Sequence, residues 1–449
     1  MRTVDHDADD AVGDGRIERL PERVQDALGE LAGAAKEGLL ALSVGVGLGV
    51  LHELMEAEVD EVVGPEGRHD RDRAAVRHGH DGGEVTLGGR RLPVSRPRAR
   101  SADGEREVEL GTYAHFAARD QLADVMLERM LVGVSTRRYA RAGEPVGREV
   151  DEVARSTSKS AVSREFVSRT RTNLIELMSR PLADLRLAVV MLDGIELKGR
   201  CCVVALGIDT DGVKHPLGLW DGSTENATVA TTLLANLVER GLDVEQGVLV
   251  VLDGAKALAK AVRDVFGTDT PVQRCQRHKE RNVLDHLPEH QRDTVRRRLR
   301  GAWSLDEHHA ALDRLRVLAD ELARTDPGAA ASLREGMEET LTITRLGIRG
   351  QLKRTLASTN PCESMIETVR RVSRNVKRWQ NGDMCLRWSA AGMLEAEQQF
   401  RRVIGHGDLP KLALAVEADV ATQRAAATPI STPHQPVPTG APEVAATPV

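Results

Sequence analysis

Two aspartates in this sequence occupy the same place relative to an apolar run. Asp193 follows the run 188–192 and Asp253 follows the run 247–252, and a glycine comes next in both cases. A carboxylate directly after a buried strand is held at the rim of a sheet, where ligands bind in open α/β folds. A single Asp-Gly pair after a strand usually forms only a turn. Two matching placements in one sheet favour a functional site.

Glu363 is the candidate for a third carboxylate. The pair Asn360-Pro361 predicts the start of a long helix, with Asn360 as its cap and Pro361 in its first turn. Glu363 would lie in that first turn, where interaction with the helix dipole is the alternative role. Glu367 lies one turn later on the same face and is the rival for the catalytic role.

Three carboxylates suit the metal-dependent attack of an oxygen nucleophile on a phosphodiester. Two divalent ions about 4 Å apart can contact both the entering and the leaving oxygen. Mg²⁺ (or Mn²⁺) prefers carboxylate oxygens. We therefore expect Asp193, Asp253 and Glu363 to be catalytic residues and metal ligands for two ions per active site. This chemistry needs no nucleophilic Ser or Cys, and none stands out in the sequence.

The segment that holds both aspartates predicts a mixed α/β sheet. Strands are expected over 188–192, 201–208, 213–220, 247–252 and 271–275, with helices over 227–240 and 255–266. Three strands joined by tight turns, followed by alternating helix and strand, give the order βββαβαβ.

The rest of the chain divides by composition and periodicity. The predicted regions are a disordered acidic tail over 1–20, a helical region over 21–65, a small basic β-containing region over 66–115, a helical region over 116–180, the first part of the core over 186–275, a helical insertion over 276–355, final core helices over 356–415 and a disordered Ala/Thr/Pro tail over 424–449. Within 66–115, residues 78–83 predict a turn, and the stretches 84–87 and 91–94 predict a small hairpin.

A helix-turn-helix is possible near the end of the 116–180 region. Its first helix would span 147–155, its turn 156–158 and its second helix 159–172. Val162, Phe166 and Val167 share one face of that second helix. The residues left to meet DNA are Ser160, Ser163 and Arg164. Structural packing of two short helices is an equally good interpretation of this pattern.

The net charge of −6 argues at first against a nucleic-acid partner, but the charge is unevenly distributed. Acidic residues gather in the first 14 residues, whereas basic residues cluster over 90–100, 274–300 and 370–378. Such runs can simply be solvated, yet three of them flanking the candidate site favour phosphate contacts. The candidate contacts are Arg277, Lys279, Arg281, Arg370, Arg371 and Arg374.

The cysteines and the apolar segments indicate in which cellular compartment the protein is expected. Five cysteines without regular spacing resemble neither a disulfide framework nor a four-ligand zinc site, so a reducing cytoplasm is expected, with nucleoid association when DNA is bound. The longest apolar run, 39–51, is shorter than the roughly 20 residues that a membrane span needs. We expect it to form part of a buried or interface helix, with no membrane partner.

The sequence resembles the mutator-type transposases of bacterial insertion sequences, which carry a DDE active site. The stretches that carry the resemblance are 53–61, 133–138, 192–198, 252–258, 273–283 and 359–364, and together they cover roughly residues 35–415. The resemblance implies the triad Asp193, Asp253 and Glu363 and a helical insertion before the glutamate. Departures after Asp193 and Glu363, where an expected aromatic and a more polar run are missing, remove no ligand. The implied fold is α/β, an RNase H-like mixed sheet (βββαβαβα) with an all-helical insertion, preceded by mainly helical DNA-binding regions.

The resemblance also implies partners and further residues. We expect binding to double-stranded DNA, both the terminal inverted repeats of the element and the target, by a homodimer or larger synaptic complex, with a circular intermediate. Cys275 and His278 form the family's C-x-x-H, with a structural or DNA-positioning role, and a buried Cys beside a hydrogen-bonded His is the alternative. Trp303 would either stack on a base or pack in a core. The functional alternatives are a catalytically silent, transposase-derived repressor and a plain RNase H-like nuclease.

Overall fold

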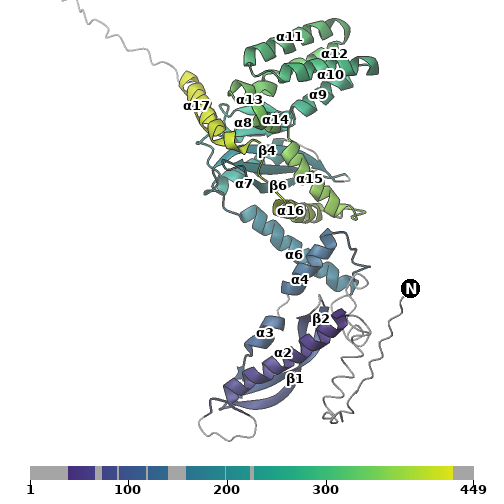
Figure 1. The fold of residues 1–449 in the computed structure, drawn as a ribbon, viewed down its shortest axis with the longest axis vertical. Coiled ribbons are helices and arrows are strands. Elements are labelled where there is room, and N and C mark those ends of the chain that lie inside the picture. Colours follow the sequence, from purple (N-terminus) through teal and green to yellow (C-terminus); the bar gives the residue numbers. More distant parts are fainter. Residues whose placement is uncertain are drawn as a thin grey trace, which may run out of the picture. The chain divides into compact units, whose positions relative to one another are not determined.

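The computed structural model describes residues 39–65, 73–87, 90–117, 120–139, 158–197, 199–222 and 227–427 (Figure 1). These belong to two compact units, Met1–Arg169 and Thr170–Val449. The predicted acidic tail over 1–20, the predicted helix over 147–155 and residues 428–449 lie outside the described part of the chain.

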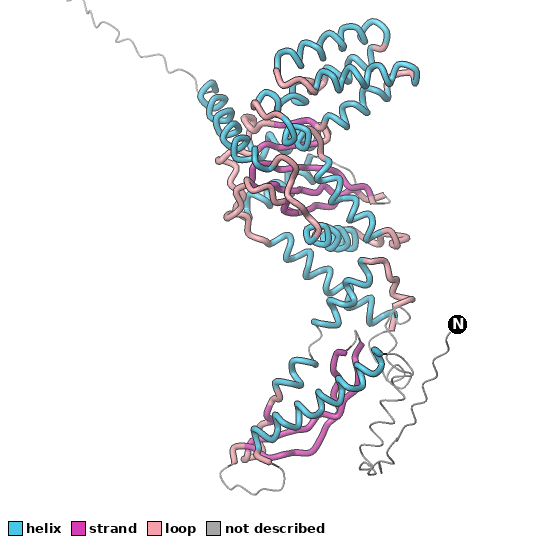
Figure 2. The backbone as a smooth tube through the Cα atoms, in the orientation of Figure 1, coloured by secondary structure: helices cyan, strands magenta, loops and turns pink. Residues whose placement is uncertain are grey.

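The first unit is built on a helix that lies along a β-hairpin (Figure 2). The helix is α2 (Leu39–Val63), the hairpin strands are β1 (Ala75–Leu87) and β2 (Arg90–Ser101), and the short strand β3 (Glu107–Val108) pairs with β2. Leu51, Met55, Val59 and Val63 recur every four residues on α2, so they share one face. That face packs against buried strand residues of the hairpin. Helices α3 (Gly111–Ala117) and α4 (Asp120–Leu131) follow.

The turn predicted over residues 78–83 is wrong, because β1 runs straight through this segment. Asp81 pairs with Arg96 in the antiparallel register, and the register shifts only between Arg77 and His80. Gly79 has a φ of +72° at this point, so it takes the left-handed conformation that a β-bulge requires. Gly79 therefore forms an irregularity within a strand, and the strand continues to Leu87, which pairs with Arg90.

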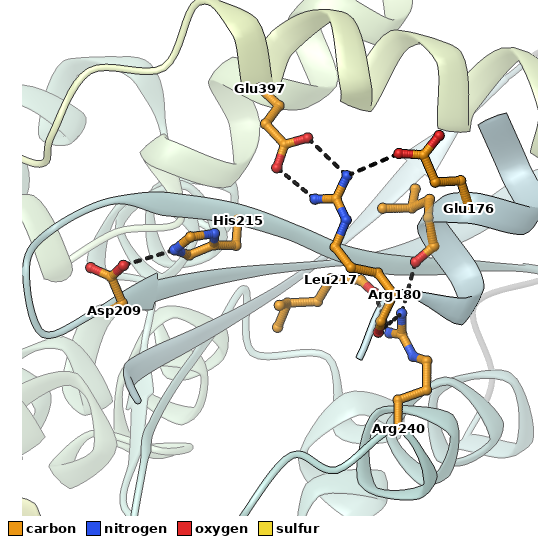
Figure 3. Close-up of polar contacts among 8 residues, drawn as sticks. Glu176, Arg180, Asp209, His215, Leu217, Arg240 and Glu397 are labelled. Atoms are coloured by element: carbon orange, nitrogen blue, oxygen red, sulfur yellow. Dashed lines mark hydrogen bonds and ion pairs between the residues drawn. The ribbon is translucent and has the colours of Figure 1, made fainter. Parts of the chain in front are cut away.

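Helix α6 (Lys159–Ser179) begins where the second helix of the motif was predicted but continues seven residues beyond residue 172. At the C-terminal end of α6, two arginines make hydrogen bonds to other elements of the second unit (Figure 3). The Arg180 guanidinium donates to both carboxylate oxygens of Glu397, at 2.7 and 3.2 Å. Arg240 donates to the Leu177 carbonyl at 2.7 Å and to the Leu217 carbonyl. The motif stays a prediction, since its first helix is not among the described residues.

The second unit contains the predicted mixed sheet. Its strands are β4 (Leu187–Glu196), β5 (Cys201–Asp209), β6 (Lys214–Gly222), β7 (Leu249–Leu252) and β8 (Val272–Arg274), with helices α7 (Ala227–Glu239) and α8 (Lys256–Phe266). The spatial order is β6-β5-β4-β7-β8. β4, β5 and β6 pair antiparallel, whereas β7 and β8 pair parallel to β4 and to each other. The predicted element order βββαβαβ is confirmed.

Both faces of this sheet are buried. Met191 and Val251 belong to a core shared with α15 (Asn360–Ser373), α16 (Gly382–Gln398) and α17 (Leu409–Ala427). Val190 and Val250 point the other way and pack with α7 and α8. Alternation along a strand sends successive side chains to opposite faces, so burial on both sides explains why these strands are continuously apolar. Figure 1 shows the helices on either side of the strands.

Between β8 and α15 the chain is helical, as predicted for 276–355. The helices are α9 (Gln276–Asp285), α10 (Glu289–Trp303), α11 (His308–Thr325), α12 (Pro327–Arg334), η2 (Glu338–Leu341), α13 (Thr342–Arg345) and α14 (Gly350–Leu356). The helices α9 to α12 enclose a core of their own, built mainly of leucine and alanine. None of the described helices is both long and apolar enough to cross a membrane.

The predicted C-terminal tail begins too early. Helix α17, which follows the short helix η3 (His406–Asp408), continues to Ala427, so residues 424–427 are helical. Arg424 explains the extension, because its guanidinium contacts Glu245 and Asp269 at 2.7 and 2.5 Å. Ion pairs with two loops of the unit thus favour one more helical turn than the local composition indicates.

Candidate active site

Asp193 and Asp253 occupy corresponding positions on neighbouring strands. β4 and β7 pair in parallel up to Leu192 opposite Leu252, and each aspartate is the next residue. Asp253 follows the end of β7, as predicted. The prediction that Asp193 also follows a strand end is wrong, since β4 continues to Glu196 and Asp193 pairs with Val204 of β5. β4 is a central strand, and its antiparallel neighbour extends it past the end of β7.

Glu363 lies near Asp193, on helix α15, which packs on the sheet. Asp193 lies on the same face of β4 as Met191 and Ile195, and these two residues belong to the core covered by α15. Glu363 lies in the first turn of α15. Its Oε1 accepts a hydrogen bond from the Thr359 hydroxyl at 3.2 Å and lies 4.0 Å from Nε2 of His278.

A cavity of about 450 Å³ joins these groups. Its lining residues are Asp193, Gly194, Arg277, His278, Arg281, Asn360, Glu363, Ser364, Ile366, Glu367 and Arg370. The structure therefore brings together Asp193, Glu363 and the rival Glu367. Asp253 is not among the lining residues, but its charge acts on both Asp193 and His278. A lining that holds both carboxylates and arginines suits an anion that is bound through a cation.

Asp193 has the properties of a carboxylate that needs a cation. Burial, and then the negative charge of Asp253, raise the pKa of Asp193 to about 6. Its Oδ1 accepts from the Gly194 amide at 2.9 Å, and the Thr359 hydroxyl also lowers its pKa, but its buried Oδ2 has no hydrogen-bond partner among the described residues. An unsatisfied buried carboxylate oxygen is costly, and a divalent ion would satisfy it. The donor set is also all oxygen, which is what Mg²⁺ prefers, so these residues fit a divalent cation.

His278, which also lines this cavity, supplies positive charge beside Glu363. The sulfur of Cys275 and then the charges of Asp193 and Asp253 raise the pKa of His278 to about 9, against the effect of burial. These neighbours therefore favour the protonated form of the imidazole. Although burial acts in the opposite direction, contact with His278 lowers the pKa of Cys275. Cys275 is fully buried, 3.8 Å from the Thr359 hydroxyl, so the C-x-x-H pair links α9 to the loop before Glu363.

The start of α15 differs from the prediction in one detail. Pro361 lies in the first turn as predicted, but the cap position is Thr359 and not Asn360. The Asn360 side chain instead accepts a hydrogen bond from Arg277 at 3.2 Å. Asn360 therefore orients an arginine that lines the cavity.

Lys279 is a wrong prediction as a DNA contact, because it is fully buried. Its ammonium donates to the carbonyl of Ser332 at 2.6 Å and to that of Glu335, at the end of α12. The last carbonyls of a helix lack intrahelical partners, and a lysine can satisfy them. Burial lowers the pKa of Lys279 to about 8. Its role in this structure is to join α9 to α12.

Trp303 belongs to the core of the insertion. Its side chain is 5% exposed, and its indole Nε1 donates to the Thr340 hydroxyl at 3.1 Å. A base cannot stack on a ring buried in this way, so the structure supports the second of the two interpretations, a core tryptophan.

The other predicted DNA contacts lie on the surface. Ser160, Ser163 and Arg164 are exposed on α6, and Arg277 and Arg281 are exposed on α9. Exposed side chains also include Arg370, Arg371 and Arg374 near the end of α15. Parts of the basic runs are neutralised within the fold. Arg98 pairs with Glu107, and Arg300 pairs with Glu280.

A second cavity, of about 770 Å³, was not predicted from the sequence. We call it the basic cavity, and its lining residues are Lys214, Arg277, Gln351, Arg354, Thr355, Ser358, Asn360, Pro361, Ser364, Arg401, Arg402, Val403 and Ile404. Five of these are basic and none is acidic. It shares Arg277, Asn360 and Ser364 with the cavity of Asp193. The sequence signals for it were Arg277 in the basic run 274–300 and the adjacent pair Arg401-Arg402.

Comparison with known proteins gives a consistent family. The sequence matches the family described as "Transposase, Mutator family" over residues 24–403. The transposase for insertion sequence element ISRM5 of Rhizobium meliloti (strain 1021) is 29% identical over 377 residues, covering 81% of this chain and 92% of that protein. The transposase for insertion sequence element IS256 in transposon Tn4001 of Staphylococcus aureus is 27% identical over 363 residues, covering 78% and 89%.

A probable insertion-sequence transposase of Corynebacterium diphtheriae is 30% identical over 235 residues, covering 52% of this chain and 66% of that protein. The family match includes the segments that carry Asp193, Asp253 and Glu363. It also spans the helical insertion between β8 and α15. Because the match covers most of the sequence, the chain belongs to the Mutator family of transposases.

Proposed function

We propose that this transposase cuts and joins DNA at a DDE site formed by Asp193, Asp253 and Glu363, on a sheet of the RNase H type. The observation that carries the proposal is the parallel register of β4 and β7, which makes the two aspartates neighbours below the helix that bears Glu363. The buried Oδ2 of Asp193, which has no hydrogen-bond partner in the described part of the chain, supports a metal role for this group. The strand order β6-β5-β4-β7-β8 supports the fold proposal.

The carboxylates of Asp193, Asp253 and Glu363 would hold two Mg²⁺ (or Mn²⁺) ions, which activate the attacking oxygen and stabilise the leaving oxygen. The protein's own residues would do the rest. Arg277, Arg281 and Arg370 line the cavity and would position the phosphates by charge-assisted hydrogen bonds. Protonated His278 would offset negative charge near Glu363. Thr359 and the Gly194 amide hold two of the carboxylates in place.

On this proposal the protein binds the terminal inverted repeats of its element, hydrolyses one strand at each end, and directs the 3′-hydroxyl onto new DNA. Two ends must meet for this, so a homodimer or larger complex on DNA is expected. The exposed face of α6 with Ser163 and Arg164 is the candidate for reading the ends. The basic cavity would hold the phosphate backbone that continues from the active site.

Incubation of the protein with DNA that contains an element end tests the proposal directly. Nicks that leave 3′-hydroxyl groups at the end should form with Mg²⁺ and not with a chelator. The alternative, a transposase-derived repressor, predicts end binding without any metal-dependent nick. A plain nuclease predicts cutting without preference for the end.

Metal binding should depend on pH in a way that follows from Asp193. Its pKa of about 6 means that protons compete with cations below that value, since a ligand must be deprotonated. Affinity for Mn²⁺ should therefore rise between about pH 5 and about pH 7 and level off above. Calorimetric titration with Mn²⁺ at several pH values across this range measures the affinity. In Asp253→Asn the remaining affinity should be lower, with its midpoint at lower pH, because one cause of the raised pKa is gone. An affinity independent of pH would contradict the assignment of Asp193.

The basic cavity should contribute affinity without specificity. Replacing Arg401 and Arg402 with alanine should weaken binding to element ends and random DNA alike, because phosphate contacts carry no sequence information. The slope of log affinity against log salt should fall by about 0.9 for each lost contact. Fluorescence anisotropy at several salt concentrations measures both effects.

The matched control removes the same charge elsewhere. Arg316 and Arg334 lie on the insertion and pair with Glu338 and Asp320. Their double alanine variant should leave the salt slope nearly unchanged. If both double variants lower the slope equally, net charge and not the basic cavity controls binding. Arg164→Ala should instead reduce the preference for ends over random DNA.

A further inference from the structure

Cys202, Asp221 and Cys385 meet at a place that the proposed chemistry does not use. Cys202 on β5 lies directly opposite Asp221 on β6 in the antiparallel register, so their side chains share one face of the sheet. Cys385, near the start of α16, comes to the same face from above. Both cysteines are fully buried, and the Asp221 side chain is 15% exposed.

The distances among the three groups suit a tetrahedral metal centre. The two sulfurs lie 3.4 Å apart, and the Cys202 sulfur lies 3.7 Å from Oδ1 of Asp221. All three candidate ligand atoms lie within 4.8 Å of one another. Around a tetrahedral Zn²⁺, ordinary bond lengths place two sulfurs about 3.8 Å apart and a sulfur and an oxygen about 3.6 Å apart. Two of the three distances therefore match these values to within a few tenths of an ångström, and the third, from the Cys385 sulfur to the Asp221 carboxylate, is at most 4.8 Å.

The surroundings of Asp221 hold its carboxylate in the required orientation. Arg200 donates to Oδ2 at 2.9 Å, which leaves Oδ1 facing the sulfurs. Gly382 allows this approach, because a Cβ at that position would lie 2.2 Å from Oδ2. Hydrogen bonds to the far side of a ligand are typical of metal sites, where they fix the ligand's orientation. The guanidinium also offsets the single negative charge that two thiolates, one carboxylate and a divalent cation would leave.

We propose that Cys202, Asp221 and Cys385 bind a thiophilic divalent cation of the Zn²⁺ class, with water in the fourth position. Thiolates select such an ion over Mg²⁺, so this site is chemically distinct from the carboxylate site of Asp193. The ion would cross-link β5 and β6 to α16. α16 packs on α15, which carries Glu363, so the cross-link would stabilise the support of the active site.

Cobalt titration of the full-length protein, stripped of metal by a chelator, tests the site. Co²⁺ should give sulfur-to-cobalt charge-transfer absorption and the strong visible bands of tetrahedral coordination, and Zn²⁺ should abolish both at one equivalent. Cys202→Ser and Cys385→Ser should each lose the charge-transfer bands. Arg200→Gln should weaken affinity about 10- to 100-fold. Zn²⁺ should raise the melting temperature of the parent protein but not of Cys385→Ser.

Two controls make the result unambiguous. Cys201→Ser changes the neighbouring cysteine, whose side chain lies on the opposite face of β5, and it should keep the full cobalt spectrum. Asp253→Asn should also keep it, so failure of the catalytic proposal would not affect this one. Far-ultraviolet circular dichroism and end binding show whether each serine variant is folded. Cobalt spectra without sulfur bands, or sulfur bands that survive both serine changes, would overturn the site.

Discussion

Asp253→Asn should abolish strand cleavage and leave binding to element ends intact. The substitution keeps the shape of the side chain and removes one negative charge from a site proposed to hold two divalent cations. Loss of an electrostatic group of this kind typically costs about 10²–10³ or more in rate. Asp253 follows β7 and is not one of the candidate end-reading residues, so a gel shift should show binding preserved or slightly improved.

The chain offers a closely matched control in Asp243. Asp253 Oδ1 accepts from the amide two residues later, Ala255, at 2.8 Å, and Asp243 Oδ1 accepts likewise from Glu245 at 2.9 Å. Both changes to asparagine therefore alter the same turn motif and the same net charge. Asp243→Asn should cut at the parent rate. The measurement is the rate of nick formation on end-containing DNA with saturating Mg²⁺.

Combined variants distinguish a single catalytic unit from separate contributions. Asp193→Asn should resemble Asp253→Asn, and the double variant should be no slower than either single one, because groups that act together lose their effect together. Near-parental cutting by Asp253→Asn would place the metal site elsewhere and contradict the proposed triad.

Local sequence patterns predicted the helices and strands of the second unit well but not where every element ends. The order of strands and helices follows from runs of apolar residues, which the burial of both sheet faces requires. The residue at which β4 ends does not follow from the apolar run, because residues 193–196 are held in the strand by pairing with β5. In the same way, glycines over 78–83 indicate a turn locally, whereas pairing with β2 keeps them in a strand.

Side-chain roles were predictable only where the local pattern fixes the direction of the side chain. The positions of Asp253 after a strand and of Glu363 in a first helical turn are such cases, whereas their roles stay predictions. Lys279 shows the limit, because its neighbours Arg277 and Arg281 are exposed while it reaches the end of α12, more than 50 residues away. The pairing of Cys202 with Cys385 depends on a separation of 183 residues, which no local pattern can indicate.

The choice between Glu363 and Glu367 is open to an equally direct experiment. Both glutamates line the cavity, one turn apart on α15. Glu363 is half-buried, with Thr359 and His278 beside its carboxylate, while Glu367 is exposed. A metal ligand must be held in place by neighbouring groups, so the contacts favour Glu363.

Glu363→Gln should therefore lower the rate of nicking by about 10²–10³ or more, and Glu367→Gln, its matched control, should change it only a few-fold. Both substitutions lie on the same helix, remove the same charge and keep the side-chain length, so folding and electrostatic attraction of DNA are affected alike. Rates should be measured with Mg²⁺ and with Mn²⁺ over a range of concentrations, since a weakened metal site is partly rescued by more metal. Partial rescue is expected for Glu363→Gln, because Asp193 and Asp253 remain to hold cations. If Glu367→Gln is the slow variant and Glu363→Gln cuts normally, the third ligand is Glu367. Glu363 would then have only a structural role at the start of α15.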